Sequence, residues 1–291
     1  MTEYLPIGNQ DLLYVDGPRN TSNSTHMTKL RTVYREVVPE FIRTPLYKLR
    51  KGYPGKYPTE IQESFRGIDI NFFVTNIKVH ERARNLSYER KFLNSFFEVI
   101  SQGNGDVFWD VGAHFGVWTI LAAKKQPDLK IVSFEPEVEC SEALSKNISL
   151  NQLDQQGIER LPIAITNEKG ITSFYSSGLE GSAASVCDTA DHLNEVEVES
   201  HSVDTLVDEG IALAPTIMKV DIEGGEVLLV DGMNKYLPQH LFIELHPEMI
   251  NKCFDISTNE VWEKIISKGY QPVSVGARRE SLLCHFELKS T

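Results

Sequence analysis

A short segment that begins with an acidic residue and carries two glycines is the first feature of this sequence that could bind a ligand. It reads Asp110-Val111-Gly112-Ala113-His114-Phe115-Gly116, between a predicted buried strand over residues 107–111 and a predicted helix over residues 117–125. Gly112 and Gly116 allow the backbone to approach a ligand closely, and the start of the helix offers unpaired N–H groups. The segment therefore predicts a loop that binds a nucleotide-type cofactor.

The charge of this loop separates two classes of cofactor. A dinucleotide loop has glycines at its first, third and sixth positions to hold a pyrophosphate, and here those positions are Asp110, Gly112 and Phe115. A carboxylate would repel a pyrophosphate, whereas S-adenosyl-L-methionine has no phosphate and carries an ammonium and a sulfonium. We therefore predict S-adenosyl-L-methionine as the cofactor, bound in this loop by Asp110, Val111, Gly112, Ala113, His114 and Gly116.

Glu135 and Pro136 follow the next predicted strand and are expected to form the second half of the cofactor site. An acidic residue at this place binds ribose hydroxyls. NAD-dependent enzymes use the same device, so Glu135 alone does not discriminate, but together with Asp110 it favours methyl transfer over hydride transfer. We also include two further residues in the cofactor site, namely Ala164, in a third predicted strand over residues 158–165, and Asp221, after a later predicted strand.

Acidic and imidazole side chains end the next two predicted strands. Asp221 and Glu223 follow one strand, and in an open parallel sheet they would point toward the transferring methyl group. Glu244 and His246 end the other strand, where strand alternation places them on the same side. Methyl transfer to an alcohol requires removal of the hydroxyl proton, so His246, Asp221 or Glu223 is the predicted general base. If His246 is the base, activity should rise with pH near its usual pKa of about 6.5.

Each catalytic candidate also has a purely structural interpretation. Asp221 and Glu223 could cap a helix predicted to begin near Gly225, since acidic side chains stabilise helix N-termini. His246 could be a structural histidine with satisfied hydrogen bonds. Lys219 alternates with Asp221 along its strand, and we expect it to be the buried partner of a carboxylate.

The same residues raise the question of a metal ion. Four side chains could in principle hold Mg²⁺ together, namely Asp221, Glu223, Glu244 and His246. Magnesium prefers a set of oxygen ligands, and the sequence has no further oxygen-rich run near these residues. We therefore predict a site without a metal.

The elements that position these residues alternate between strand and helix from about residue 107 onward. Such alternation specifies an α/β fold with a largely parallel sheet and helices on both faces. Before it, we expect a hairpin of strands over residues 68–74 and 77–80, then a helix over residues 88–100 that Ser87 caps. Further elements are expected over residues 130–134, 138–150, 172–175, 183–186, 196–202, 217–221, 241–245, 258–268, 270–275 and 282–288.

The domain organisation follows from the same pattern. Residues 1–65 are expected to form an N-terminal extension that is partly helical or loose, since a polar tract at 20–25 and several prolines interrupt any regular spacing. Residues 66–291 are expected to form one domain, in which the hairpin and helix within 66–101 precede the alternating elements.

Five segments resemble the FkbM family of methyltransferases, in the family's order. They are Asp110-Val111-Gly112-Ala113, Phe134-Glu135-Pro136, Ser202-Val203-Asp204-Thr205-Leu206, Lys219-Val220-Asp221-Ile222-Glu223-Gly224 and Ile243-Glu244-Leu245-His246. The resemblance implies a Rossmann-like class I methyltransferase fold with a mostly parallel seven-stranded sheet whose last strand is antiparallel. It also implies O-methylation, commonly of sugars, polyketides or other secondary metabolites. The family's loop usually has Asn where this sequence has His114.

The composition narrows the class of partner. With 29 Lys and Arg against 41 Asp and Glu, the formal net charge of the 291 residues is −12. Phosphate binding needs clustered Lys and Arg, so we expect no nucleic-acid partner. A hydrophobic fraction of 41% is typical of a globular protein with a substantial core. We expect a small molecule or a glycan as the methyl acceptor.

The sequence also predicts where the protein works. No apolar run approaches the roughly 20 residues that span a bilayer, so no transmembrane segment is expected. Glu3 and Asp11 stand where a signal peptide would have a basic segment and an apolar run. We therefore expect a cytoplasmic protein, in which four cysteines far apart in the sequence are reduced: Cys140, Cys187, Cys253 and Cys284.

Two other functions compete with methyl transfer. One is a NAD-dependent oxidoreductase, which the carboxylate of Asp110 disfavours. The other is a non-catalytic module that keeps the donor-binding fold for interaction or regulation. The presence of Asp221, Glu223 and His246 together argues against the second, because a binding module has no use for a general base.

Overall fold

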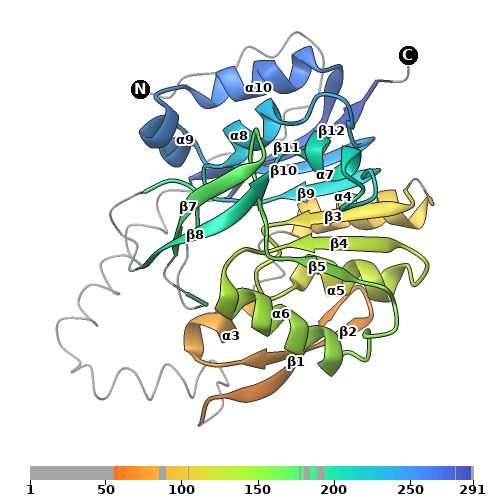
Figure 1. The fold of residues 1–291 in the computed structure, drawn as a ribbon. Coiled ribbons are helices and arrows are strands. Elements are labelled where there is room, and N and C mark those ends of the chain that lie inside the picture. The colour runs from red at the N-terminus through yellow and green to blue at the C-terminus, as the bar shows by residue number, and fades with distance from the viewer. Residues whose placement is uncertain are drawn as a thin grey trace, which may run out of the picture.

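A seven-stranded sheet is the framework of the part of the chain that the structure describes (Figure 1). This computed structural model describes residues 56–84, 90–103, 105–176, 178–179, 184–188, 194–278 and 280–289. The strand order is β11-β12-β10-β9-β3-β4-β5. Neighbours from β10 to β5 are parallel, and β12 is antiparallel to both β10 and β11. The strands are β3 (Val107–Val111), β4 (Lys130–Phe134), β5 (Glu159–Leu161), β9 (Ile217–Val220), β10 (His240–Leu245), β11 (Tyr270–Arg278) and β12 (Ser281–Leu288).

Helices cover both faces of this sheet, as predicted. Successive side chains of a strand point to opposite faces, so Phe108 packs in one apolar cluster and Trp109 in the other. The first cluster contains α4 (Arg90–Ser101), α5 (Val117–Lys125), α6 (Val138–Leu150) and the hairpin of β1 (Thr59–Phe65) and β2 (Ile68–Val74). The second contains α7 (Val203–Asp208), α8 (Glu226–Asp231), α9 (Pro247–Phe254) and α10 (Thr258–Ser267).

The elements around the cofactor loop have the bounds that the sequence predicts. All five residues of β3 are buried, and four of them are apolar, as expected for a strand covered on both faces. Helix α6 begins where Glu137 accepts a hydrogen bond from the Cys140 N–H. These strands and helices confirm the predicted alternation, and the antiparallel β12 confirms what the family resemblance implies.

The predicted hairpin has one wrong strand. Residues 77–80 belong to a helix, α3 (Ile77–Arg84), and the partner of β2 is β1, which precedes it. Helix α3 forms there because the Asn76 side chain accepts hydrogen bonds from the N–H groups of Lys78 and Val79, at 2.8 and 3.1 Å. The predicted domain boundary after residue 65 falls inside the hairpin, so β1 packs with the residues that follow it.

The predicted third strand over residues 158–165 is divided into two. Its first part is β5, at the edge of the main sheet, and its second part is β6 (Ala164–Ile165), which pairs with β8 (Asn194–His201). Pro162 lies between them and cannot donate a ladder hydrogen bond. The strands β6, β8 and β7 (Gly170–Ser176) form a separate three-stranded sheet, which confirms the strands predicted near residues 172–175 and 196–202.

Other predicted elements are confirmed or lie outside the described residues. The helix predicted over 88–100 is α4, whereas its proposed cap, Ser87, is outside the described residues. Of the predicted strand over 183–186, Ser185 forms a single bridge with Tyr175, and residue 183 is also outside them. None of the helices in the described part of the chain combines the length and apolar character needed to cross a bilayer.

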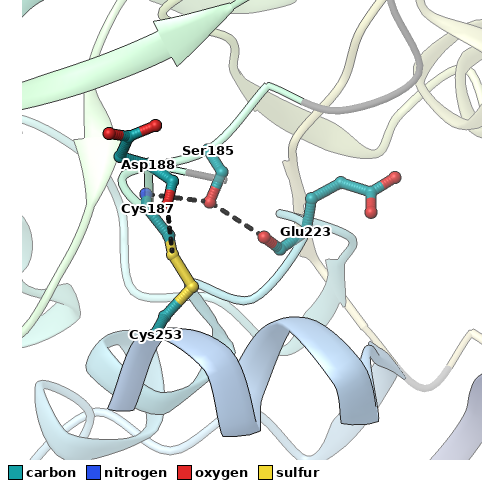
Figure 2. Close-up of a disulfide and its surroundings, with 5 residues drawn as sticks. All are labelled: Ser185, Cys187, Asp188, Glu223 and Cys253. Carbon is teal, nitrogen blue, oxygen red and sulfur yellow. Dashed lines mark hydrogen bonds between the residues drawn. A yellow bond between two sulfur atoms is a disulfide. The ribbon is translucent and has the colours of Figure 1, made fainter. Parts of the chain in front are cut away.

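Two cysteines that we predicted to be reduced form a disulfide (Figure 2). Cys187 and Cys253 are 66 positions apart in the sequence, and their Cα atoms are 6.0 Å apart. Cys253 lies near the end of α9, beside which the segment over residues 184–188 passes. The spacing of these two cysteines in the sequence does not indicate a disulfide, because the fold rather than the local sequence brings them together. The other two cysteines, Cys140 and Cys284, are free and buried.

Candidate active site

A cavity of about 220 Å³ lies at the carboxyl ends of β3, β4 and β9. Ligands bind at this edge of open α/β sheets. Two of the three predicted catalytic residues line it, namely Asp221 and Glu223. Of the predicted cofactor residues, the cavity wall contains Val111, Gly112, Ala113, His114, Glu135, Pro136, Ala164 and Asp221.

Gly112 brings the cofactor loop against the loop that follows β9. Its φ is 74°, in the left-handed region that favours glycine. A Cβ atom at this position would overlap with the carbonyl oxygen of Asp221. The N–H groups of Gly112 and Ala113 both donate to the carbonyl of Phe134, at 3.0 and 3.1 Å. The cofactor loop after β3 and the loop after β9 are therefore in direct contact.

His114 occupies a second left-handed position in this loop, with φ of 50°. Asn and His are enriched in this region among residues other than glycine, which explains how His114 can stand where the family usually has Asn. Its Nε2 lies 3.2 Å from Nη1 of Arg82. Burial, with the charge of Arg82, lowers the pKa of His114 to about 3, so the ring is neutral.

Gly116 is a structural residue rather than part of the cavity wall. It is the N-terminal cap of α5 with φ of 94°. A Cβ atom there would overlap with the side chain of Leu144 on α6. Gly116 thus allows α5 and α6 to pack closely, and its contact with the cofactor stays a prediction.

Asp110 lies behind the cavity wall and is fully buried. Its Oδ2 accepts hydrogen bonds from the N–H and the hydroxyl of Thr119, at 3.0 and 2.7 Å. Its Oδ1 is 3.3 Å from Nζ of Lys219, which also donates to the carbonyl of Gly112 at 2.7 Å. The predicted ion pair of Lys219 is confirmed. The expected direct contact of Asp110 with the cofactor does not fit, because its carboxylate faces α5 and Lys219.

Glu135 is buried and lies in the cavity wall, as the sequence suggests. Its Oε2 accepts from the N–H of His114 at 2.7 Å, and its Oε1 accepts from the N–H of Glu137 at 2.9 Å. Burial raises the pKa of Glu135 to about 7, although these two hydrogen bonds act against the rise. Each carboxylate oxygen can accept a second hydrogen bond, so the group can still receive ribose hydroxyls.

Asp221 and Glu223 follow β9 and face the cavity. Their side chains are 30% and 29% exposed, so a ligand in the cavity can reach them. Helix α8 begins at Glu226 with Gly225 as its N-terminal cap, and no side chain makes a capping hydrogen bond there. The alternative interpretation of Asp221 and Glu223 as helix caps is therefore not supported.

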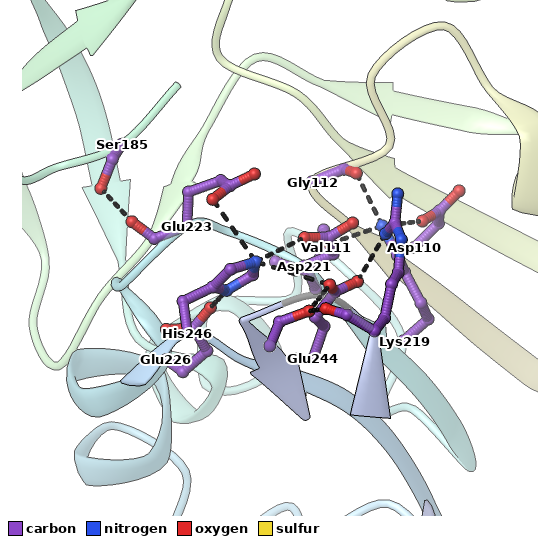
Figure 3. A network of polar contacts seen from close by, with 12 residues as sticks. Asp110, Val111, Gly112, Ser185, Lys219, Asp221, Glu223, Glu226, Glu244 and His246 are labelled. Carbon is purple, nitrogen blue, oxygen red and sulfur yellow. Dashed lines mark hydrogen bonds and ion pairs between the residues drawn. The ribbon is translucent and has the colours of Figure 1, made fainter. Parts of the chain in front are cut away.

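His246 follows β10 and lies behind these two carboxylates (Figure 3). Its Nδ1 is 2.7 Å from Oε1 of Glu226, which is fully buried. Its Nε2 is 3.4 Å from Oε2 of Glu223 and 3.8 Å from Oδ1 of Asp221. Asp221, Glu223 and His246 are a group of described residues whose side chains could share one metal ion.

Glu244 lies on the same side of β10 as His246, as strand alternation predicts. Its Oε1 is 3.7 Å from Nε2 of His246 and also accepts a hydrogen bond from the hydroxyl of Ser281. Its Oε2 accepts from Nη1 of Arg278 at 2.9 Å. Burial raises the pKa of Glu244 to about 7, with a further rise from the charge of Asp221.

The pKa of His246 is higher than the value of about 6.5 expected from the sequence. Burial lowers its pKa, but the hydrogen bond and charge of Glu226, with the charges of Glu223 and Asp221, outweigh burial and raise the pKa to about 10. An ionisation near 6.5 from His246 therefore does not fit the structure without a bound ligand. Burial raises the pKa of Glu223 to about 7. Burial would also raise the pKa of Asp221, but the charges of Lys219 and His246 lower it.

Several residues of the cavity wall were not found from the sequence. Arg82 lies in α3, just after the residues 77–80 that were predicted as a strand, and Arg278 ends β11, beyond its predicted bounds. Phe174 on β7 and Val186 add apolar surface. These residues lie outside the motif segments, and only the fold brings them to the cavity.

Comparison with known proteins agrees with the geometry. The family model described as the methyltransferase FkbM domain matches residues 110–272. The hexuronic acid methyltransferase AglP of Haloferax volcanii is 25% identical over 182 residues, which are 62% of this chain and 72% of that protein. The methyltransferase sdnD of Sordaria araneosa is 27% identical over 152 residues, which are 52% of this chain and 56% of that protein.

Among solved structures, the methyltransferase FkbM from Methylobacillus flagellatus matches with a TM-score of 0.45 and 15% identity. That match covers 63% of this chain and 44% of the other. The family model, by contrast, covers more than half of this chain and includes both loops that meet at Gly112. The chain therefore belongs to the FkbM family of methyltransferases.

Proposed function

We propose that this chain is an S-adenosylmethionine-dependent O-methyltransferase that acts on a hydroxyl of a small molecule or glycan, with a carbohydrate as the acceptor. The observation that carries the proposal is the contact at Gly112. There the loop after β3 meets Asp221, and both line one cavity. A donor in the first loop and an acceptor hydroxyl at the second would be neighbours.

The residues of the wall fit this methyl donor. When bound, S-adenosylmethionine would supply a methyl group on a sulfonium, and the leaving group would be a neutral thioether. Glu135 would accept the ribose hydroxyls, and the backbone of Gly112 and Ala113 would lie beside the rest of the molecule. The backbone of Asp221 meets Gly112 and the residue lines the same cavity, so we infer that its carboxylate would disfavour a pyrophosphate there. Asp221, rather than the buried Asp110, is thus the acidic residue that would disfavour NAD.

Asp221 and Glu223 would receive the acceptor hydroxyl and its proton. Both side chains reach the cavity, whereas His246 lies behind them with its Nδ1 held by Glu226. His246 would therefore position the two carboxylates and stabilise their charge. A positioned base contributes about 10²- to 10⁴-fold, and alignment of donor and acceptor contributes up to about 7–11 kcal/mol in ideal models.

A carbohydrate acceptor is supported by two observations. One relative is a hexuronic acid methyltransferase, and a hexuronic acid has both hydroxyls and a carboxylate. Arg82 and Arg278 line the same cavity, and guanidinium groups bind carboxylates through paired hydrogen bonds. An acidic sugar is therefore the first acceptor to test.

The test is methyl transfer from S-adenosylmethionine to a panel of neutral sugars, uronic acids and their oligomers, followed by mass spectrometry. We expect products that are heavier by one CH₂ group, with the new methyl on oxygen. Asp221→Asn should lower turnover by about 10²- to 10⁴-fold and leave donor binding nearly unchanged. Donor binding without turnover on any acceptor would favour the non-catalytic alternative, and methylation of nitrogen or carbon would contradict the proposal.

A further inference from the structure

Three side chains beside the cavity have the spacing of a metal-binding group. One atom from each of Asp221, Glu223 and His246 lies within 4.8 Å of the others. The distances from Nε2 of His246 to the two carboxylate oxygens are 3.4 and 3.8 Å. Adjacent ligands of an octahedral cation bound at about 2.1–2.4 Å are about 3.0–3.4 Å apart. The two distances from His246 are therefore within about 0.4 Å of that spacing, and the carboxylate oxygens of Asp221 and Glu223 lie within 4.8 Å of each other.

The hydrogen bond of His246 orients its free nitrogen toward the two carboxylates. Nδ1 donates to Oε1 of Glu226 at 2.7 Å, so in a neutral ring the lone pair is on Nε2. Metal-binding histidines almost always donate their other N–H to a carboxylate, a carbonyl or a water in this way. The fully buried Glu226 on α8 thus holds the imidazole in the tautomer that a cation requires.

Glu226 adds a further carboxylate on the Nδ1 side of the imidazole, opposite the two proposed ligands. Oε2 of Glu226 is buried and has no hydrogen-bond partner among the described residues. A buried carboxylate with incomplete hydrogen bonding is costly unless a positive charge lies nearby.

The other carboxylates of the network have basic partners, since Asp110 contacts Lys219 and Glu244 contacts Arg278. The carboxylates of Asp221, Glu223 and Glu226 surround one imidazole, and of these three Asp221 is also under the influence of the charge of Lys219 (Figure 3). A divalent cation would balance these three charges better than a single proton on His246.

We propose that Asp221, Glu223 and His246 bind a divalent cation, with Glu226 as the residue that orients His246. Carboxylate ligands suit Mg²⁺ and Mn²⁺, and an imidazole ligand favours the transition metal, so Mn²⁺ is the preferred probe. Both carboxylates face the cavity, so the remaining coordination positions would face the acceptor. The role of the cation rests on the proposed function, because a cation beside the acceptor hydroxyl would lower the pKa of that hydroxyl. Binding of the cation does not rest on it.

The direct experiment is a titration of the purified full-length chain with Mn²⁺ in the absence of any methyl donor. Electron paramagnetic resonance measures the free ion. We expect one bound Mn²⁺ per chain, and Asp221→Asn or Glu223→Gln should weaken binding at least about ten- to a hundred-fold, since even outer-shell changes have effects of that size. The matched control is Glu248→Gln, an exposed carboxylate in the first turn of α9, which should bind Mn²⁺ as the wild type does.

Circular dichroism establishes whether each variant is folded. If Asp221→Asn does not fold, the loss of Mn²⁺ binding in Glu223→Gln tests the proposal. Absence of Mn²⁺ binding to the wild type would overturn the proposal. So would undiminished binding to folded Glu223→Gln, or an equal loss in Glu248→Gln, since the latter would indicate a general surface effect.

A methyl-transfer assay with and without EDTA separates this inference from the proposed function. Loss of activity in EDTA that Mn²⁺ restores supports both. Full activity in EDTA would overturn the role of the cation and leave the proposed function intact. Specific Mn²⁺ binding without any donor binding would support the metal site and count against the proposed function.

Discussion

The cofactor loop is held in place by a buried ion pair beneath it. Asp110 accepts two hydrogen bonds from Thr119 at the start of α5, and Lys219 connects it to the carbonyl of Gly112. Lys219 is only 4% exposed and Asp110 is fully buried. The pair therefore joins β3, β9 and α5 at the point where the loop leaves the sheet, and its contribution should be measurable as stability.

We expect Asp110→Asn to lower the free energy of unfolding by about 3–5 kcal/mol, because it leaves the ammonium of Lys219 buried without its counter-charge. Urea denaturation followed by circular dichroism measures the change. The matched control is Asp208→Asn, which breaks an exposed ion pair with Lys235 and should cost little. The double variant Asp110→Asn with Lys219→Met should recover part of the loss. Equal stability of Asp110→Asn and Asp208→Asn would show that the buried pair does not hold the loop.

For single residues, the sequence predicts which ones lie near the cavity but not the direction of each side chain. Glu135, Asp221 and Glu223 could be found because each follows a strand that ends at the same edge of the sheet. Asp110 satisfies the same rule, yet its side chain turns toward α5, because Thr119 and Lys219 provide its partners there. The elevated pKa of His246 could not be predicted either, since it arises from Glu226, a residue in another segment.

Among the elements, the disulfide connects α9 to the cavity wall. The N–H of Cys187 donates to the hydroxyl of Ser185 at 3.1 Å, and that hydroxyl donates to the carbonyl of Glu223 at 2.8 Å (Figure 2). The neighbours of Ser185 on either side, Ala184 and Val186, line the cavity. The bond between Cys187 and Cys253 thus fixes a segment that lines the cavity.

We expect reduction of this disulfide to destabilise the fold and to weaken donor binding. A loop of 66 positions corresponds to about 4 kcal/mol of chain entropy in the loop-closure model. The measurement is the melting temperature with and without a phosphine reductant, together with a donor titration under both conditions. Cys253→Ser is the control, because a chain without the disulfide should show no effect of the reductant. Identical melting of the oxidised and reduced wild type would contradict this role.

The elements that the sequence predicted correctly are those with a clear local signal. The strands β3, β4 and β10 are mainly apolar. In the structure, α6 and α10 begin at the capping residues Glu137 and Ser257. The errors occur where one residue outweighs the apolar pattern. Asn76 begins a helix in a segment that alternates like a strand, and Pro162 divides a strand that otherwise reads as continuous.

For the whole molecule, buried groups with raised pKa values make stability depend on pH. The pKa of His246 is raised to about 10, and those of Glu135, Glu223 and Glu244 are each raised to about 7. Each group holds its proton to higher pH in the folded chain than in the unfolded chain. Its contribution to stability is therefore complete at low pH and is lost as the pH rises through the folded value.

Between about pH 7.5 and 8.5, His246 is the group that dominates this effect, because unfolded histidine has already lost its proton at about 6.5. We expect the free energy of unfolding of the metal-free protein to fall by up to about 1.4 kcal/mol per pH unit in this window. Urea denaturation in EDTA at several pH values measures the slope. His246→Gln should flatten it, and an unchanged slope in that variant would assign the effect to another group.

The sheet as a whole explains why methyl transfer is the activity that this architecture supports. Its parallel strands end at one edge, where the loops after β3, β4 and β9 form a common wall. Methyl transfer between two bound molecules needs their alignment above all, and a shared cavity provides it. The identity of the donor is the claim on which the rest depends.

Isothermal titration calorimetry of the purified full-length chain with S-adenosylmethionine, S-adenosylhomocysteine and NAD tests that claim most directly. We predict binding of the first two and little or no binding of NAD. Glu135→Gln should weaken donor binding about ten-fold to over a hundred-fold, since a hydrogen bond to a charged group contributes about 1.5–3 kcal/mol. Glu142→Gln, an exposed carboxylate on α6, should leave it unchanged. Tight binding of NAD, or no binding of S-adenosylmethionine, would contradict the account.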